Sequence, residues 1–181
     1  MGKRTIITVG AATGLAFMLG AAGLSGAAQP DTTIEAEAMA AMMDAEGDSV
    51  GTVALKQGPH GTLLHARLTG LPPGTRAIHV HESGACEPPD FESAGDHYDP
   101  DDRAHGFFNE DGYHPGDLPN IHVPESGIIE VELFSEHLKL DDDLFDEDGA
   151  SLVIHTEADD YRTDPSGDAG GRIACGVIER N

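Results

Sequence analysis

Hydrophobic and polar positions alternate with a period of two in several short runs of this chain. The runs occupy residues 50–56, 64–68 and 77–81, and further strands are predicted at 127–133, 151–155 and 172–178. Turn residues separate the early runs, as in Gly58-Pro59 and Leu71-Pro72-Pro73-Gly74. A period of two places successive side chains on opposite faces of a strand. Short alternating runs bounded by turns predict an all-β fold, an antiparallel sandwich or barrel.

The segment before the first clear run is ambiguous. Residues 31–48 are compatible with a first strand followed by an acidic turn, but the Ala, Glu and Met residues from Glu35 to Met43 favour a helix. The local pattern leaves this choice open.

Two long polar stretches interrupt the predicted strands. Residues 82–125 and 156–171 are rich in Gly, Pro, Asp and other polar residues and show little apolar periodicity. Long irregular loops are uncommon inside a compact domain and are usually functional where they occur. We therefore predict two long functional loops.

The first 28 residues have the features of a secretory signal peptide. Lys3 and Arg4 precede an uncharged stretch over 6–24 that is rich in Ala, Gly, Leu and Ile, and small residues follow at 26–28. The alternative is an uncleaved membrane anchor, because the stretch approaches the ~20 residues of a spanning helix. The small residues at 26–28 favour cleavage by a signal peptidase. We therefore expect a signal peptide at 1–28, a mature domain at 29–181, and an exported protein, periplasmic or extracellular, without membrane association after cleavage.

The chain is strongly acidic. It has 33 acidic and 10 basic residues, a formal net charge of −23. Loss of Lys3 and Arg4 with the signal leaves eight basic residues and a net charge of −25. Such a charge argues against nucleic acid or anionic lipid as a partner. Because the acids are spread along the chain, they favour a role in solubility or in adaptation to salt.

Cys86 and Cys175 are the two cysteines of the chain. Both lie in the predicted mature part. A pair of cysteines in an oxidising compartment predicts one disulfide rather than two free thiols.

Ten histidines beside only three lysines suggest metal binding. His79 and His81 lie two residues apart on a predicted strand, so both imidazoles project from one face. In the first long loop, His97, His105 and His114 precede Asp117, and three nitrogens with one carboxylate suit a closed tetrahedral zinc site. A metal can order a loop that buries little apolar surface. The alternative, a disordered polar loop, explains these histidines less well.

The order of these residues resembles the copper/zinc superoxide dismutase family. The matching segments are His79-x-His81, Gly84-x-Cys86, Ala94-Gly95-Asp96-His97, His105-Gly106, His114-Pro115-Gly116-Asp117-Leu118, His155 and Gly170-Gly171-Arg172-Ile173-Ala174-Cys175-Gly176-Val177-Ile178. The likeness runs from about Ala36 to Ile178. It implies a Greek-key β-sandwich or barrel, and it implies that Glu35–Met43 is an edge strand despite its helix propensity.

The resemblance also implies a metal site. Its copper ligands would be His79, His81, His97 and His155, and its zinc ligands His97, His105, His114 and Asp117. His97 would bridge the metals and move a proton, and Asp159 would hydrogen-bond His79 and His105. Cys86 and Cys175 would form the family disulfide, and Arg172 would receive the anion. The remaining histidines match no ligand position and are expected on the surface: His60, His65, His122 and His137.

The implied activity is dismutation of superoxide to oxygen and hydrogen peroxide by a redox-cycling copper beside a structural zinc. Many family members carry lysines near copper that steer superoxide, but residues 156–172 hold five acids, two arginines and no lysine. We therefore expect slower association that added salt accelerates. The alternative function is a non-catalytic exported copper/zinc carrier, but the complete ligand set with Arg172 favours the enzyme. The sequence leaves the oligomeric state open, a homodimer included.

Overall fold

A computed structural model describes residues 1–2 and 35–181. Its strands are β1 (Ala38–Asp44), β2 (Ser49–Gly58), β3 (Gly61–Leu68), β4 (Gly74–Arg76), β5 (Ile78–His81), β6 (Ile121–Val123), β7 (Ile129–Ser135), β8 (Ser151–His155) and β9 (Arg172–Arg180), and a short 3-10 helix, η1, spans Glu92–Ala94. The predicted all-β class is confirmed. Apart from Met1 and Gly2, the predicted signal peptide at 1–28 lies outside the described residues. No helix within the described residues is long and apolar enough to cross a membrane.

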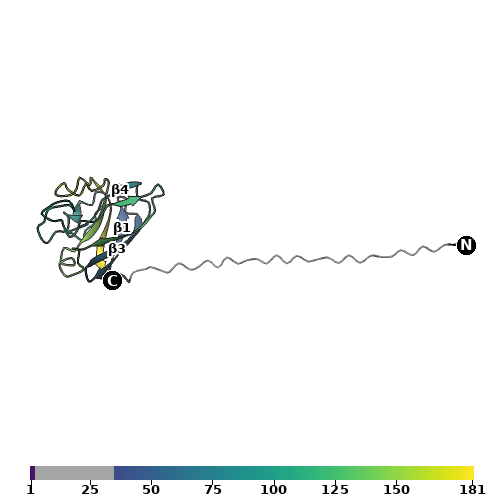
Figure 1. Cartoon of the computed structure of the whole chain (residues 1–181), viewed down its shortest axis with the longest axis horizontal. Helices are drawn as coiled ribbons and strands as arrows, with labels where there is room; N and C mark the ends of the chain where they lie inside the picture. The colour runs from purple at the N-terminus through teal and green to yellow at the C-terminus, as the bar shows by residue number, and fades with distance from the viewer. Residues whose placement is uncertain (3–34) are drawn as a thin grey trace. The chain divides into compact units, whose positions relative to one another are not determined.

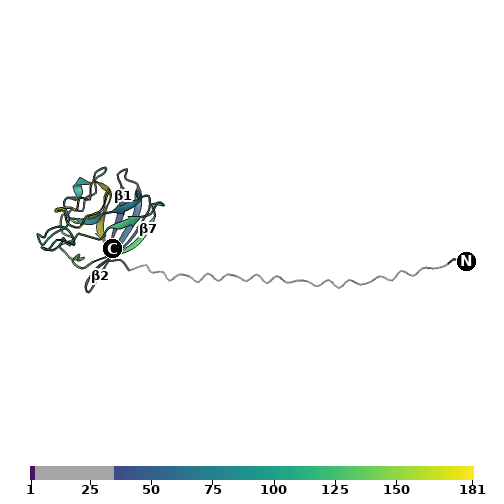
Figure 2. The same cartoon turned by 45° about the horizontal axis from the view of Figure 1, so that its top comes forward.

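Seven strands form one antiparallel sheet in the order β5-β8-β9-β1-β2-β3-β7, and β4 pairs with β6 in a small second sheet. Figure 1 and Figure 2 show the strands gathered into one curled body, with long loops beside them. Three neighbouring pairs lie far apart in the sequence: β1 with β9, β3 with β7, and β5 with β8. These crossovers agree with the predicted antiparallel barrel.

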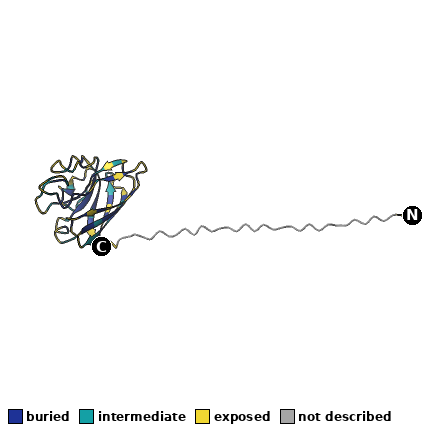
Figure 3. Ribbon diagram, in the orientation of Figure 1, coloured by how far each residue is buried: buried dark blue, intermediate teal, exposed yellow. Residues whose placement is uncertain are grey.

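The core lies on the inner face of the curled sheet. On β3, Leu64, Ala66 and Leu68 are almost completely buried, as the period of two predicts. Ala66 pairs in register with Val53 of β2, and Val53 pairs with Ala40 of β1. Buried side chains of three strands therefore line up across the sheet, and Figure 3 shows burial concentrated along the strands and exposure in the loops.

The prediction of an edge strand at Glu35–Met43 is wrong in its position. The strand β1 begins at Ala38, ends at Asp44 and pairs with both β2 and β9, so it lies inside the sheet. Ala38, Ala40 and Met42 are buried there. Packing on both sides outweighs the helix propensity of this segment because propensity is a weak preference that tertiary contacts override.

The first long loop is more ordered than its sequence suggests. Within 82–125, β6 places Ile121 and Val123 in the core and pairs with β4, a strand that the sequence pattern also missed. Both strands have three residues, too few for alternation to stand out. Cys86 of this loop is bonded to Cys175 of β9, which confirms the predicted disulfide and ties the loop to the sheet.

Candidate metal centre

Four buried histidines from three segments form a first group. His79 and His81 lie on β5, His155 ends β8, and His97 comes from the first long loop. One ring nitrogen of each lies within 4.8 Å of the others. Nε2 of His155 is 3.2 Å from Nδ1 of His79 and 3.4 Å from Nε2 of His81. A cluster of imidazoles suits copper or zinc, among other metals.

A second group consists of three histidines around one carboxylate. Oδ1 of Asp117 lies 3.0 Å from Nδ1 of His97, 3.0 Å from Nδ1 of His105 and 3.3 Å from Nδ1 of His114. Its other oxygen, Oδ2, accepts hydrogen bonds from the backbone N–H groups of Gly106 at 2.9 Å and His114 at 3.1 Å. The loop backbone thus holds the carboxylate so that Oδ1 faces three imidazole nitrogens, which suits zinc.

His97 belongs to both groups. Its Nδ1 faces Asp117, while its ring centroid lies 4.1 Å from that of His79 and 5.0 Å from that of His81. Among the described residues, Nε2 of His97 is buried without a hydrogen-bond partner. Buried polar atoms are normally paired, so an orphaned nitrogen on the histidine that both groups share fits an expected metal ligand.

Asp159 connects the two groups through hydrogen bonds to one histidine of each. Its Oδ2 accepts a hydrogen bond from Nε2 of His79 at 2.8 Å, and its Oδ1 accepts one from Nε2 of His105 at 3.0 Å. Protons held at these Nε2 atoms leave both Nδ1 atoms free to face a metal. The geometry is the one that the resemblance implied.

Asn120 holds Asp159 in place, a contact that the sequence did not reveal. Its side-chain amide donates to the backbone carbonyl of Asp159 and its side-chain oxygen accepts from the backbone N–H, each at 2.9 Å. The backbone N–H of Tyr161 donates to Oδ1 of Asp159 at 2.6 Å. No motif marks Asn120, because its partner lies 39 residues away.

Arg172 lines the same hollow as His81, His97 and His155 of the first group. Its Nη1 donates to the carbonyl oxygen of Phe91 at 2.6 Å, and its Nη2 donates to that of Gly95 at 2.7 Å. The same Gly95 oxygen lies 3.0 Å from Nδ1 of His81. Gly95 has φ +74°, in the left-handed region that favours glycine. One carbonyl therefore fixes Arg172 relative to His81.

Burial keeps histidines of the first group neutral. It lowers the pKa of His97 to about 4, the pKa of His155 to about 3, and the pKa of His81 well below its ordinary value. Neighbouring imidazoles and, for His81 and His155, the positive charge of Arg172 add to this effect. Neutral imidazole is the form that binds a metal.

In the second group, the pKa values of His105 and His114 are raised rather than lowered. Burial opposes protonation of His105, but its hydrogen bonds to Asp117 and Asp159 outweigh burial and raise the pKa of His105 to about 9. Despite burial, the hydrogen bonds of Asp117 with His105, His114 and His97 hold the pKa of its carboxyl far below the usual range. The carboxylate is therefore ionised and ready to bind a cation.

Metal-free protein is expected to be most stable near pH 6.5. As the pH falls below 6.5, the unfolded chain protonates His81, His97 and His155 while the folded chain does not, so the free energy of unfolding decreases toward pH 4. As the pH rises, the contribution of His105 is lost as the pH passes through about 9. Urea midpoints measured from pH 4 to pH 9.5 test this, and midpoints that keep rising below pH 6 would contradict it.

The other histidines lie outside both groups. His60 and His122 are exposed and His137 is half-buried. The expectation that His65 is a surface residue is wrong, because only 6% of it is exposed. Its Nε2 lies 3.0 Å from Oε1 of Glu130.

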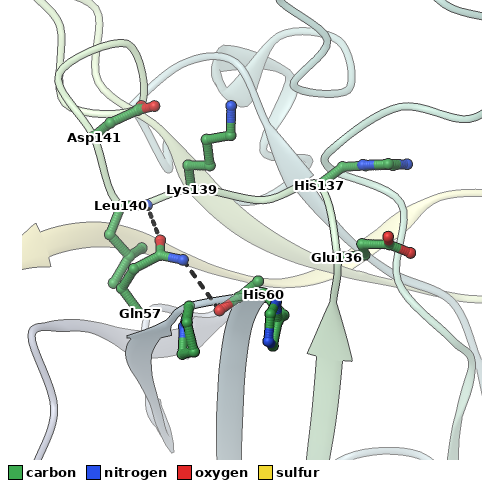
Figure 4. Close-up of a pocket in the computed structure, with 9 residues that line it drawn as sticks. Gln57, His60, Glu136, His137, Lys139, Leu140 and Asp141 are labelled. Carbon is green, nitrogen blue, oxygen red and sulfur yellow. Dashed lines mark hydrogen bonds between the residues drawn. The ribbon is translucent and has the colours of Figure 1, made fainter.

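A separate hollow of about 510 Å³ lies between the β2–β3 turn and the segment after β7. His60, Glu136, His137 and Lys139 are among its lining residues, and Gln57 hydrogen-bonds Leu140 across it. Figure 4 shows that the rings of His60 and His137 do not point toward one another. Within the described residues, neither belongs to a group that could hold a metal.

The family profile described as copper/zinc superoxide dismutase (SODC) matches residues 49–178. The chain belongs to the copper/zinc superoxide dismutase family. A curated relative from Aquifex aeolicus, "Superoxide dismutase [Cu-Zn] 1", is 41% identical over 150 residues, which cover 80% of this chain and 89% of the relative.

Two solved structures extend this family assignment to the fold. A superoxide dismutase-like protein from Bacillus subtilis has a TM-score of 0.73 and 38% identity, covering 77% of this chain and 96% of that one. The copper/zinc superoxide dismutase from Brucella abortus has a TM-score of 0.67 and 33% identity, covering 79% of this chain and all of that one. The chain is thus an oxidoreductase of the superoxide dismutase family, and copper and zinc, the expected cofactors, are those of the family.

Proposed function

We propose that this chain converts superoxide to oxygen and hydrogen peroxide with copper held by the first group and zinc by the second. The copper ligands are His79, His81, His97 and His155, and the zinc ligands are His97, His105, His114 and Asp117. The observation that carries the proposal is that the two groups share His97, whose Nδ1 faces Asp117 and whose Nε2 is buried and unpartnered among the described residues. Copper, when bound, supplies one-electron redox chemistry, which zinc cannot.

Arg172 binds and orients the anion in this proposal. A guanidinium stays charged and presents several N–H donors in a fixed plane. The carbonyl oxygens of Phe91 and Gly95 restrain it beside His81. Superoxide that reaches the hollow therefore meets a positive charge whose position is already set.

His97 supports proton transfer. Its Nε2 has no competing protein partner among the described residues, so this atom would hold a proton whenever it is not bound to copper and would give that proton to the product peroxide. Its Nδ1 remains engaged with the second group, which keeps the ring oriented. Asp159, held by Asn120, keeps the rings of His79 and His105 in place.

Replacing His81 with alanine is expected to abolish copper binding and rapid superoxide decay while zinc binding persists, because His81 belongs only to the first group. The unaltered protein should hold one copper and one zinc per chain. His122→Ala is the matched control, since that histidine is exposed and outside both groups. Metal content by mass spectrometry and superoxide decay by pulse radiolysis give the answer. Bound metals without decay in the unaltered protein would favour the carrier function.

The proposed site of action is outside the cytoplasm. The support is the charge pattern of residues 1–28 and the Cys86–Cys175 disulfide, which persists in oxidising compartments. N-terminal sequencing of the protein from the extracytoplasmic fraction is expected to begin close to Gln29. A membrane-bound chain that retains residues 1–28 would instead indicate an anchor.

A further inference from the structure

We propose that an acidic groove beside the first histidine group captures cationic copper and delivers it to these histidines. The acidic groove is formed by Glu82, Asp99, Asp143, Asp146 and Asp148. This inference rests on the proposed function and adds the route by which the copper arrives.

The acidic groove is one of two neighbouring hollows. The inner hollow, about 450 Å³, contains His81, His97, His155 and Arg172 in its wall. The outer hollow, about 470 Å³, is the acidic groove itself. Glu82 and Asp99 line both hollows, so the groove lies directly beside the hollow that contains the histidines.

The charge along this path is predominantly negative. The carboxylates that line one or both hollows are Glu82, Asp96, Asp99, Asp102, Asp143, Asp146, Asp148 and Asp164. Two arginines oppose them, and Arg103 lies 2.8 Å from Asp101 in an ion pair.

Acidic residues are abundant in this chain, so their charge does not by itself identify a ligand. The second observation is His97, which lines the inner hollow with 4% of its side chain exposed and with Nε2 unpartnered among the described residues. At the junction, Oδ1 of Asp99 is likewise buried without a described partner. A path that begins with carboxylates and ends at imidazoles suits copper, because copper prefers imidazole nitrogen to carboxylate oxygen.

The same charges act oppositely on the substrate. A cleft lined by one sign of charge changes the association rates of ions by about 10- to 1,000-fold, and salt weakens the effect. An acidic path therefore accelerates a copper cation and slows the superoxide anion. Slow substrate association would be the consequence of a path suited to acquiring the metal.

The test measures copper uptake by zinc-loaded, copper-free protein mixed with CuCl₂ in a stopped-flow instrument. The readout is the growth of the copper–histidine ligand-field absorption. The variant tested, called the groove variant, combines D143N and D148N from the acidic groove with D96N from the inner hollow, and these carboxylates accept no hydrogen bond from the described residues. The control combines E125Q, E132Q and E179Q, which remove the same charge from exposed positions outside both hollows.

At low ionic strength, the groove variant is expected to take up copper about tenfold more slowly than the control, and its rate should depend less on salt. The same variant should dismutate superoxide faster once it is loaded. All three proteins should finish with one copper per chain. Equal uptake rates for the groove variant and the control would overturn the inference. A final content of one copper per chain in all three proteins would still leave the proposed function intact. Failure of the unaltered protein to bind copper would contradict both.

Discussion

Replacing Cys86 with serine and Cys175 with alanine is expected to lower the free energy of unfolding of the metal-free protein by about 4 kcal/mol. The disulfide joins residues 89 positions apart, and its loss frees a long loop in the unfolded chain. In the folded chain it secures the first long loop to β9, the strand that begins with Arg172. The disulfide therefore contributes both to the stability of the chain and to the position of Arg172 relative to the loop.

Urea unfolding of the metal-free variant measures the loss. Cys175 is completely buried, so its replacement also removes packing. Unaltered protein reduced with a phosphine is the control, since it keeps both side chains and lacks only the bond. An equal decrease in the free energy of unfolding in the cysteine variant and in the reduced protein would assign the effect to the disulfide bond. A reduced protein as stable as the oxidised one would contradict the prediction.

Replacing Asp159 with asparagine is expected to weaken metal binding by about 10- to 100-fold. The carboxylate accepts hydrogen bonds from Nε2 of both His79 and His105. An amide offers one acceptor oxygen, so its NH₂ group would face one of these N–H donors. That histidine would have to move its proton to Nδ1, the atom that faces the metal group, or turn away.

Competition with chelators of known affinity measures copper and zinc binding separately. Asp168→Asn is the control, because Asp168 is exposed in the same loop and loses the same charge. The control should bind both metals as the unaltered protein does. Equal affinities in the two variants would show that Asp159 does not orient the histidines.

The sequence by itself determined most of the strands and the order of the histidines that are expected to bind metal. The run at 151–155 coincides with β8, and the run at 172–178 lies within β9. A period of two is a local property, and it is visible wherever a strand is long enough to alternate. The spacings in His79-x-His81 and from His114 to Asp117 were equally visible, because each motif holds its residues within a few positions. The cysteine pairing was predictable for another reason, because the chain has two cysteines.

Only the tertiary structure decided which segments meet. It placed β1 inside the sheet, paired the short strands β4 and β6, and buried His65 beside Glu130. It also joined Asn120 to Asp159 and placed the acidic groove beside the hollow lined by histidines of the first group. These contacts join residues far apart along the chain, and they depend on packing between strands and loops, which no local pattern encodes.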